Sequence, residues 1–184
     1  MHVDTDWVAG MCFAELTRVQ QFIKESAWHD KERCFEPVQL PTQRKTATVI
    51  DLTAEAMLTQ GLRRALAKAN PIIVGEESLL SQGRGLGGHN GIALLLDAID
   101  GTSLLEHGLD SWCSAVTVFS PAGGQILASL VAMPSGVRYV ATERGAWKLR
   151  RQGRGTEKMP LNGPSPQTDL ASASVAFYGY RYGR

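Results

Sequence analysis

Two short apolar runs in this chain each end abruptly in acidic residues, and this feature constrains the fold most strongly. Residues 72–74 read Ile-Ile-Val and lead into Gly-Glu-Glu-Ser at 75–78, whereas residues 92–96 read Ile-Ala-Leu-Leu-Leu and lead into Asp-Ala-Ile-Asp-Gly-Thr-Ser at 97–103. Short apolar runs bounded by turn residues are typical of buried strands. A carboxylate at the point where such a strand leaves the core is costly unless it is paired with a cation or accepts several hydrogen bonds. The pattern therefore predicts two strands with acidic groups at their ends.

The remaining periodicity predicts an α+β domain, with two long helices packed on a largely antiparallel sheet. Apolar residues recur at helical spacing over residues 7–28 and again over 53–69. Residues 112–119, 126–133 and 137–142 read as strands separated by Gly- and Pro-containing turns. A short helix or turn is expected after the Gly at position 101.

Three segments have weaker patterns. Residues 83–91 are rich in Gly and predict a loop; they contain a G-x-G-x-x-G match, but no strand precedes it and no helix start follows, as a dinucleotide site requires. Residues 144–158 hold six Lys and Arg and are expected to form a solvated loop with at most one further short strand. A final strand is expected at residues 173–178.

Composition narrows the class of protein. The chain has 184 residues, 43% of them apolar, and a formal net charge of +1. Such a chain can bury a core without disulfides, and its balanced charge argues against a dedicated nucleic-acid binder. The odd set Cys12, Cys34 and Cys113 contains no C-x-x-C pair, which favours a reducing, cytoplasmic location. No apolar run reaches the roughly 18 to 20 residues of a membrane span, so no membrane partner is expected.

The second acidic segment has the chemistry of a magnesium and phosphate site. Asp97 and Asp100 are three residues apart across a predicted turn, with the Ile99 carbonyl between them. Hard oxygen ligands of this kind suit Mg²⁺. Gly101 allows close approach of a ligand, and a helix start here would present its positive end to an anion. Taken singly, each acidic motif is more often a capped turn or a solvated pair; their shared position after apolar runs favours function.

These residues resemble the inositol monophosphatase family. The family signature is Gly-Glu-Glu followed by Asp-Pro-Ile-Asp-Gly-Thr, and here the same order occurs with Ala98 in place of Pro. Residues 46–66 resemble the family's stretch with an Asp just before a long helix, here Asp51. Residues 126–147 resemble its strand pair, and the likeness covers roughly residues 7–180.

The resemblance implies a role for each matching residue. Mg²⁺ ions would bind to Glu76, Asp97, the Ile99 carbonyl and Asp100. Thr102 together with Asp51 would orient and help to deprotonate the attacking water. The substrate phosphate would meet Gly101, Thr102 and Ser103. The implied reaction is Mg²⁺-dependent hydrolysis of a small phosphate monoester by direct water attack, with inositol monophosphate as the first substrate to test.

The resemblance also implies what this chain lacks. The family carries a second, C-terminal domain with a Trp-Asp-x-Ala-Ala-Gly-like motif that supplies a further metal ligand, and no such motif occurs here. Residues 1–184 are therefore expected to form a single N-terminal metal- and phosphate-binding domain. Family members often form dimers and are often inhibited by lithium, so a homodimer is compatible with the resemblance.

Two other interpretations stay open or are disfavoured. A catalytically silent or truncated metal-binding relative, acting as an interaction domain, remains the alternative to an enzyme. Haloacid dehalogenase phosphatases also use Asp-Gly-Thr, but their nucleophilic Asp would fall at Ala98, which argues against that mechanism. The four His residues have no zinc spacing, and His107 is expected at the surface.

Overall fold

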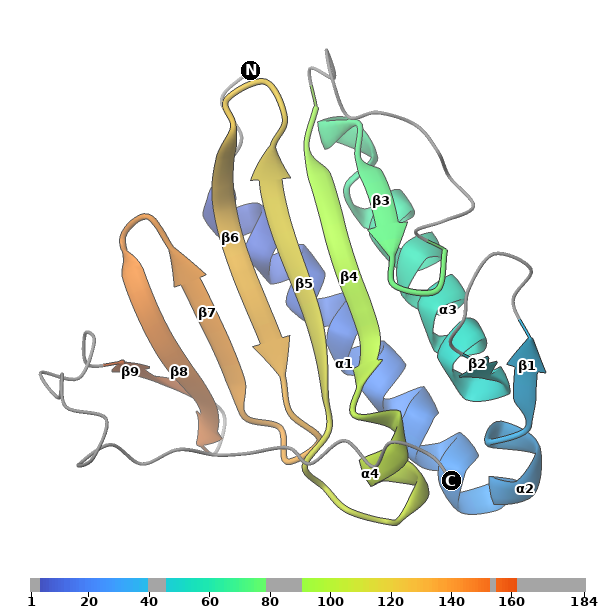
Figure 1. Ribbon diagram of the computed structural model, residues 1–184. Coiled ribbons are helices and arrows are strands. Elements are labelled where there is room, and N and C mark those ends of the chain that lie inside the picture. Colours follow the sequence, from blue (N-terminus) through green and yellow to red (C-terminus); the bar gives the residue numbers. More distant parts are fainter. Residues whose placement is uncertain (1–3, 40–45, 79–90, 153–154, 162–184) are drawn as a thin grey trace, which may run out of the picture.

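The structure, a computed structural model, describes residues 4–39, 46–78, 91–152 and 155–161. Within these ranges two long helices cover one face of a seven-stranded sheet (Figure 1). The helical elements are α1 (Thr5–His29), α2 (Lys31–Cys34), α3 (Val49–Ala65), the 3-10 turn η1 (Ala67–Ala69) and α4 (Thr102–Glu106). The strands are β1 (Pro37–Gln39), β2 (Thr46–Thr48), β3 (Ile72–Gly75), β4 (Ala93–Asp100), β5 (Cys113–Ser120), β6 (Gln125–Ala132), β7 (Arg138–Thr142), β8 (Gly145–Gln152) and β9 (Gly155–Pro160). The predicted α+β class is confirmed.

The sheet brings the two acidic segments to one edge. Its strand order is β3-β4-β5-β6-β7-β8-β9, in which β3 and β4 are parallel and all other neighbours are antiparallel. Parallel strands end at the same edge of a sheet, and Gly75 at the end of β3 is paired with Leu96 of β4. The next amide, that of Glu76, donates to the Leu96 carbonyl at 3.0 Å. Residues 75–78 therefore lie beside residues 97–102.

The core lies between the helices and the sheet. The side chain of Asp4 caps α1 by accepting from the amides of Asp6 and Trp7, and α1 and α3 then lay their apolar faces on β3–β6. Fully buried side chains include Leu16, Ile23, Leu58, Leu62, Leu94, Val118 and Leu130. Each buried Leu or Ile contributes about 1.5–3 kcal/mol to folding, so this layer fixes α3 firmly against the sheet. No helix in the described ranges is long and apolar enough to cross a membrane.

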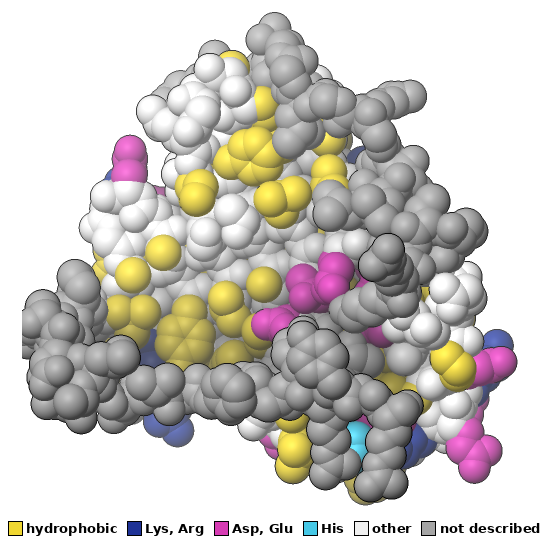
Figure 2. Space-filling model, in the orientation of Figure 1, with side chains coloured by type: hydrophobic (Ala, Val, Ile, Leu, Met, Phe, Trp, Pro, Cys, Tyr) yellow, Lys and Arg dark blue, Asp and Glu magenta, His cyan; other side chains and the backbone are white. Residues whose placement is uncertain are grey.

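The opposite face of the sheet has no helix over it within the described residues. Side chains alternate between the two faces of a strand, and those that face away from the helices are largely apolar (Figure 2). Leu95 is 44% exposed and Ile126 is 67% exposed. With Phe119 they line a depression of about 470 Å³. This face is more apolar than the solvent side of an antiparallel sheet usually is.

The second helix begins earlier than its apolar pattern predicts. α3 starts at Val49 rather than near residue 53, and it ends at Ala65, before η1. Thr48 is its N-cap and forms a capping box with Asp51. The prediction that Asp51 precedes the helix is therefore wrong, because it is the third residue of the first turn. The sequence did not predict this start because Val49 and Ile50 are β-branched, and β-branched residues favour strands over helices.

Two strand predictions need correction. β4 does not end before Asp97 but continues to Asp100, so the two Asp residues lie in an irregular strand rather than across a turn. Residues 144–158 are not a loop, because β8 and β9 pair there as antiparallel strands. Lys158 lies 4.0 Å from the Trp147 ring centroid, a cation–π contact that helps to join them. The predicted helix after Gly101 is confirmed as α4, whereas the predictions for 83–91, apart from the last residue, and for 173–178 lie outside the described residues.

Candidate active site

Asp51 and Thr102 meet where α3 approaches the end of β4. Thr102 Oγ1 lies 2.6 Å from Asp51 Oδ1 and 3.1 Å from the Ile99 carbonyl oxygen. The hydroxyl has one proton, and the shorter, charge-assisted bond to the carboxylate takes it. The other oxygen, Asp51 Oδ2, accepts from the amide of Thr48 at 2.9 Å and from its hydroxyl at 2.7 Å. Both oxygens of this carboxylate, which is only 8% exposed, are therefore partnered.

A β-bulge places Asp97 and Asp100 on the same face of the sheet. In a regular strand, residues three apart point to opposite faces. Here Asp97 pairs with Ala115 and Asp100 with Cys113, so three steps along β4 match two steps along β5. Asp97 Oδ1 accepts the Ile99 amide at 3.0 Å, and the Ser114 hydroxyl donates to the Ala98 carbonyl at 2.7 Å. These bonds hold the bulge and direct both carboxylates to the open face.

Asp97 and Glu76 interact across the two acidic segments. Burial is the main cause that raises the pKa of Asp97 to about 7. A side-chain hydrogen bond to Glu76 and the negative charges of Glu76 and Asp100 raise this pKa further, whereas the hydrogen bond from the Ile99 amide lowers it. A hydrogen bond between two carboxyl groups requires a shared proton. A divalent cation would compete with that proton for the same oxygens.

The donor set fits a hard divalent ion in its chemistry. It consists of carboxylate oxygens and a backbone carbonyl, which Mg²⁺ prefers, and its charges already repel one another at the Asp97–Glu76 contact. Among the described residues, no three or more His, Cys, Asp or Glu side chains are arranged to hold a metal ion as they stand. These residues therefore match a divalent ion in ligand type and in charge, but the described carboxylates would have to move closer together to coordinate it.

Cys113 adds a thiol that the sequence pattern does not mark. The sequence predicts an ordinary core or surface residue, but its Sγ lies 3.7 Å from Asp100 Oδ2. Burial raises the pKa of the Cys113 thiol to about 11, with smaller contributions from Asp100 and Asp97. At neutral pH it is a neutral, weakly donating neighbour of the carboxylates.

Glu55 is a second residue that sequence reasoning missed. It lies one helical turn after Asp51 on α3, is only 7% exposed, and accepts the Glu77 amide at 2.7 Å through Oε2. A signal was present, because an acidic residue sits between Ala54 and Leu58 on the apolar face of the predicted helix. An acid on such a face needs a partner, and the partner is the first acidic segment.

The other predicted residues occupy the start of α4. Gly101 is its N-cap and has a φ of +95°, a conformation that favours Gly. Ser103 is exposed, and its carbonyl lies 2.6 Å from Nδ1 of His107, which is exposed as expected. The amides that open a helix have no partner within it, so this turn offers donors beside Thr102.

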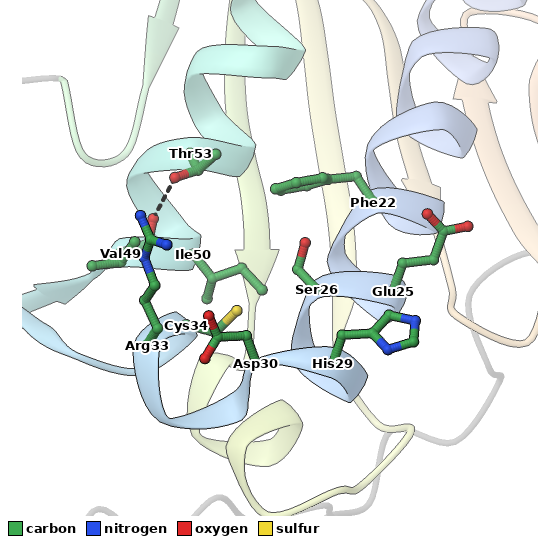
Figure 3. A pocket seen from close by; sticks show the side chains of 10 residues that line it. All are labelled: Phe22, Glu25, Ser26, His29, Asp30, Arg33, Cys34, Val49, Ile50 and Thr53. Atoms are coloured by element: carbon green, nitrogen blue, oxygen red, sulfur yellow. Dashed lines mark hydrogen bonds between the residues drawn. The ribbon is translucent and has the colours of Figure 1, made fainter.

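A separate pocket lies between the helices. Its volume is about 410 Å³, and it is lined by Phe22, Glu25, Ser26 and His29 of α1, the neighbouring Asp30, Arg33 and Cys34 of α2, and Val49, Ile50 and Thr53 of α3 (Figure 3). Among the described residues that line it, none belongs to the acidic site. Its position behind the first turn of α3 makes it a different feature from the carboxylate cluster.

Comparison with known proteins identifies the family of this chain. The sequence model of the inositol monophosphatase family matches residues 13–180. The chain belongs to the inositol monophosphatase family. A search of curated proteins found no match.

Solved structures of two inositol monophosphatases and of one suppressor protein share the fold. A staphylococcal inositol monophosphatase-1 soaked in LiCl has a TM-score of 0.59 at 16% identity, over 80% of this chain and 52% of that one. The extragenic suppressor protein SuhB from Bartonella henselae has a TM-score of 0.55 at 19% identity, over 76% and 52%. An inositol monophosphate-bound SaIMPase-II has 0.56 at 18%, over 76% and 45%. This chain thus spans about half the length of these relatives.

Proposed function

We propose that this chain carries the metal- and phosphate-binding half of an enzyme that hydrolyses a small phosphate monoester with Mg²⁺. The observation that carries the proposal is the 2.6 Å contact between Thr102 Oγ1 and Asp51 Oδ1, beside a cluster of carboxylates on one face of the sheet. Membership of the inositol monophosphatase family supports it. An inositol monophosphate is the first candidate substrate, because the similar SaIMPase-II structure holds inositol monophosphate.

The metal would be held by Glu76, Asp97, the Ile99 carbonyl and Asp100. These are hard oxygen donors, and their negative charges need a counter-charge. When bound, Mg²⁺ neutralises charge on the phosphate and makes a water molecule more acidic. The same carboxylates would repel the phosphate dianion without the ion, so substrate binding is expected to require it.

Thr102 and Asp51 would handle the proton of the attacking water. The Thr102 hydroxyl can accept a hydrogen bond from water while it donates to Asp51, so it connects the water to a buried base. The water oxygen bonds to phosphorus as the ester P–O bond breaks, and the alcohol leaves with a proton from solvent. The amides of Gly101 and Thr102, with Ser103, would hold the phosphate oxygens.

A catalytically silent metal-binding relative is the second candidate. The observation that favours it is that the chain spans about half the length of the structures it resembles, and the family resemblance places a further metal ligand in the other half. Such a protein would bind the metal and show no turnover. A homodimer and a cytoplasmic location stay predictions.

The experiment is phosphate release from inositol monophosphate and a panel of small phosphate monoesters, with and without Mg²⁺. The variant is Asp100→Asn, and the matched control is Asp30→Asn, an exposed acid outside the carboxylate cluster. We expect release that requires Mg²⁺, is lost in Asp100→Asn and persists in Asp30→Asn. Mg²⁺ binding without release from the folded protein would favour the silent relative, and release without Mg²⁺ would contradict both.

A further inference from the structure

The backbone that carries Glu76 is in contact with a buried acid on α3. Glu55 is only 7% exposed, and its Oε2 accepts the Glu77 amide at 2.7 Å across 22 positions of sequence. Burial of a carboxylate costs free energy unless the group accepts hydrogen bonds that replace those it made with water. This bond reaches the residue directly after Glu76, so it restrains the backbone at the proposed metal ligand.

Gly75 makes that contact close. A Cβ at Gly75 would overlap Glu55 Cδ and both of its carboxylate oxygens. Any side chain at position 75 would thus displace the Glu55 carboxylate from the Glu77 amide. The absence of a side chain at 75 and the acid at 55 form a single fitted contact between α3 and the end of β3.

We propose that Glu55 is a positioning residue for the metal site, which holds residues 75–77 so that Glu76 stays beside Asp97. This inference rests on the proposed function, because it assigns Glu55 to the site that the proposal describes. Glu55 acts through the Glu77 amide and is not itself a ligand. Asp51, one helical turn earlier on α3, accepts a hydrogen bond from Thr102 in the same way. One face of α3 therefore contacts both acidic segments and restrains their positions.

The test measures Mn²⁺ affinity by calorimetry in the full chain and in Glu55→Ala, Glu55→Gln and Gly75→Ala. Groups that orient metal ligands typically change affinity by about 10- to 100-fold when they are removed. We expect a loss of about tenfold or more in Glu55→Ala and in Gly75→Ala. Glu55→Gln keeps an acceptor oxygen for the Glu77 amide, so it should bind Mn²⁺ within about threefold of the unmutated chain.

The double variant separates positioning from general damage. In Glu55→Ala the Gly75→Ala change meets no carboxylate, so it should have almost no further effect, and the two losses should not add. Glu25→Ala, which truncates an exposed acid of α1, is the control for loss of a negative charge. Unfolding curves of every variant show which of them are folded.

Each outcome has one meaning. Tight Mn²⁺ binding by Glu55→Ala, or additive losses in the double variant, would overturn the positioning role and leave the proposed function intact. Failure of the unmutated chain to bind Mn²⁺ would overturn the proposed metal site and the positioning role with it. Hydrogen exchange at the Glu77 amide tests the contact without metal: we expect it to be fast in Glu55→Ala and slow in Glu55→Gln, and equal rates in the two variants would overturn the positioning role.

Discussion

The two acidic segments at the edge of the sheet are held in different ways. Residues 97–102 have one restraint of their own, the bond from the Ile99 amide to Asp97, besides bonds to β5 through Ser114 and to α3 through Asp51. Residues 75–77 depend on Glu55, which lies 22 positions before Glu77. Both segments therefore contact α3, but residues 97–102 are bonded to β5 by a side chain as well, whereas the side chain that holds residues 75–77 from a distance is Glu55 of α3. A change in α3 is expected to reach the metal ligands through residues 75–77 first.

The largest effect is expected where α3 meets residues 97–102, at the Asp51–Thr102 contact. We expect Thr102→Val to lower kcat for phosphate release by at least about 10²-fold, since it removes the hydroxyl between the water and Asp51. Steady-state kinetics with Mg²⁺ in excess measure it. Retention of kcat in Thr102→Val would show that Asp51 acts without this hydroxyl.

The next effect is expected where α3 meets residues 75–77, at the Glu55 contact. Gly75→Ala should weaken Mn²⁺ binding about tenfold, because the new methyl group displaces the Glu55 carboxylate. Gly123→Ala is a matched control in the β5–β6 turn, where the Cβ would approach the Ser120 hydroxyl most closely, at 3.1 Å. Equal losses in both variants would mean that the effect is not specific to residues 75–77.

A pH dependence links the two segments. The pKa of Asp97 is about 7 in the folded chain, against an ordinary value of 3.8, so the folded state binds this proton more tightly than the unfolded state. The resulting stabilisation is full below about pH 4 and is lost as the pH rises through about 7. In metal-free protein, Tm should fall over this range more in the unmutated chain than in Asp97→Asn. Parallel Tm curves for the two proteins would contradict the raised pKa of Asp97.

The smallest effect separates the two roles of Asp51. Thr48→Ala removes the capping box but leaves the Asp51–Thr102 bond, so it should cost about 1 kcal/mol of stability and leave kcat nearly unchanged. Urea unfolding and kinetics on the same samples measure both. A large fall in kcat in folded Thr48→Ala would mean that the cap, and not only the contact with Thr102, sets the position of the carboxylate.

The same contrast explains what the sequence could and could not predict. Residues 97–102 are contiguous, so their chemistry is visible as a motif, and the apolar runs at β3 and β4 are visible as strands. The bulge that aligns Asp97 with Asp100 depends on its pairing with β5, and the place of Glu55 depends on the packing of α3 against β3. Neither is a local property. The β8–β9 hairpin was missed because its strands are rich in Lys and Arg, and pairing rather than burial orders them.

The two segments are proposed to form one metal site whose halves α3 holds together. The most direct test is an NMR titration of the full chain with Mn²⁺, which broadens amide signals near the bound ion. We expect the signals of residues 75–78 and 97–102 to broaden together at the same Mn²⁺ concentration, and we expect Mg²⁺ to reverse the broadening. Broadening confined to 97–102, or distributed evenly over the exposed acids, would contradict this proposal.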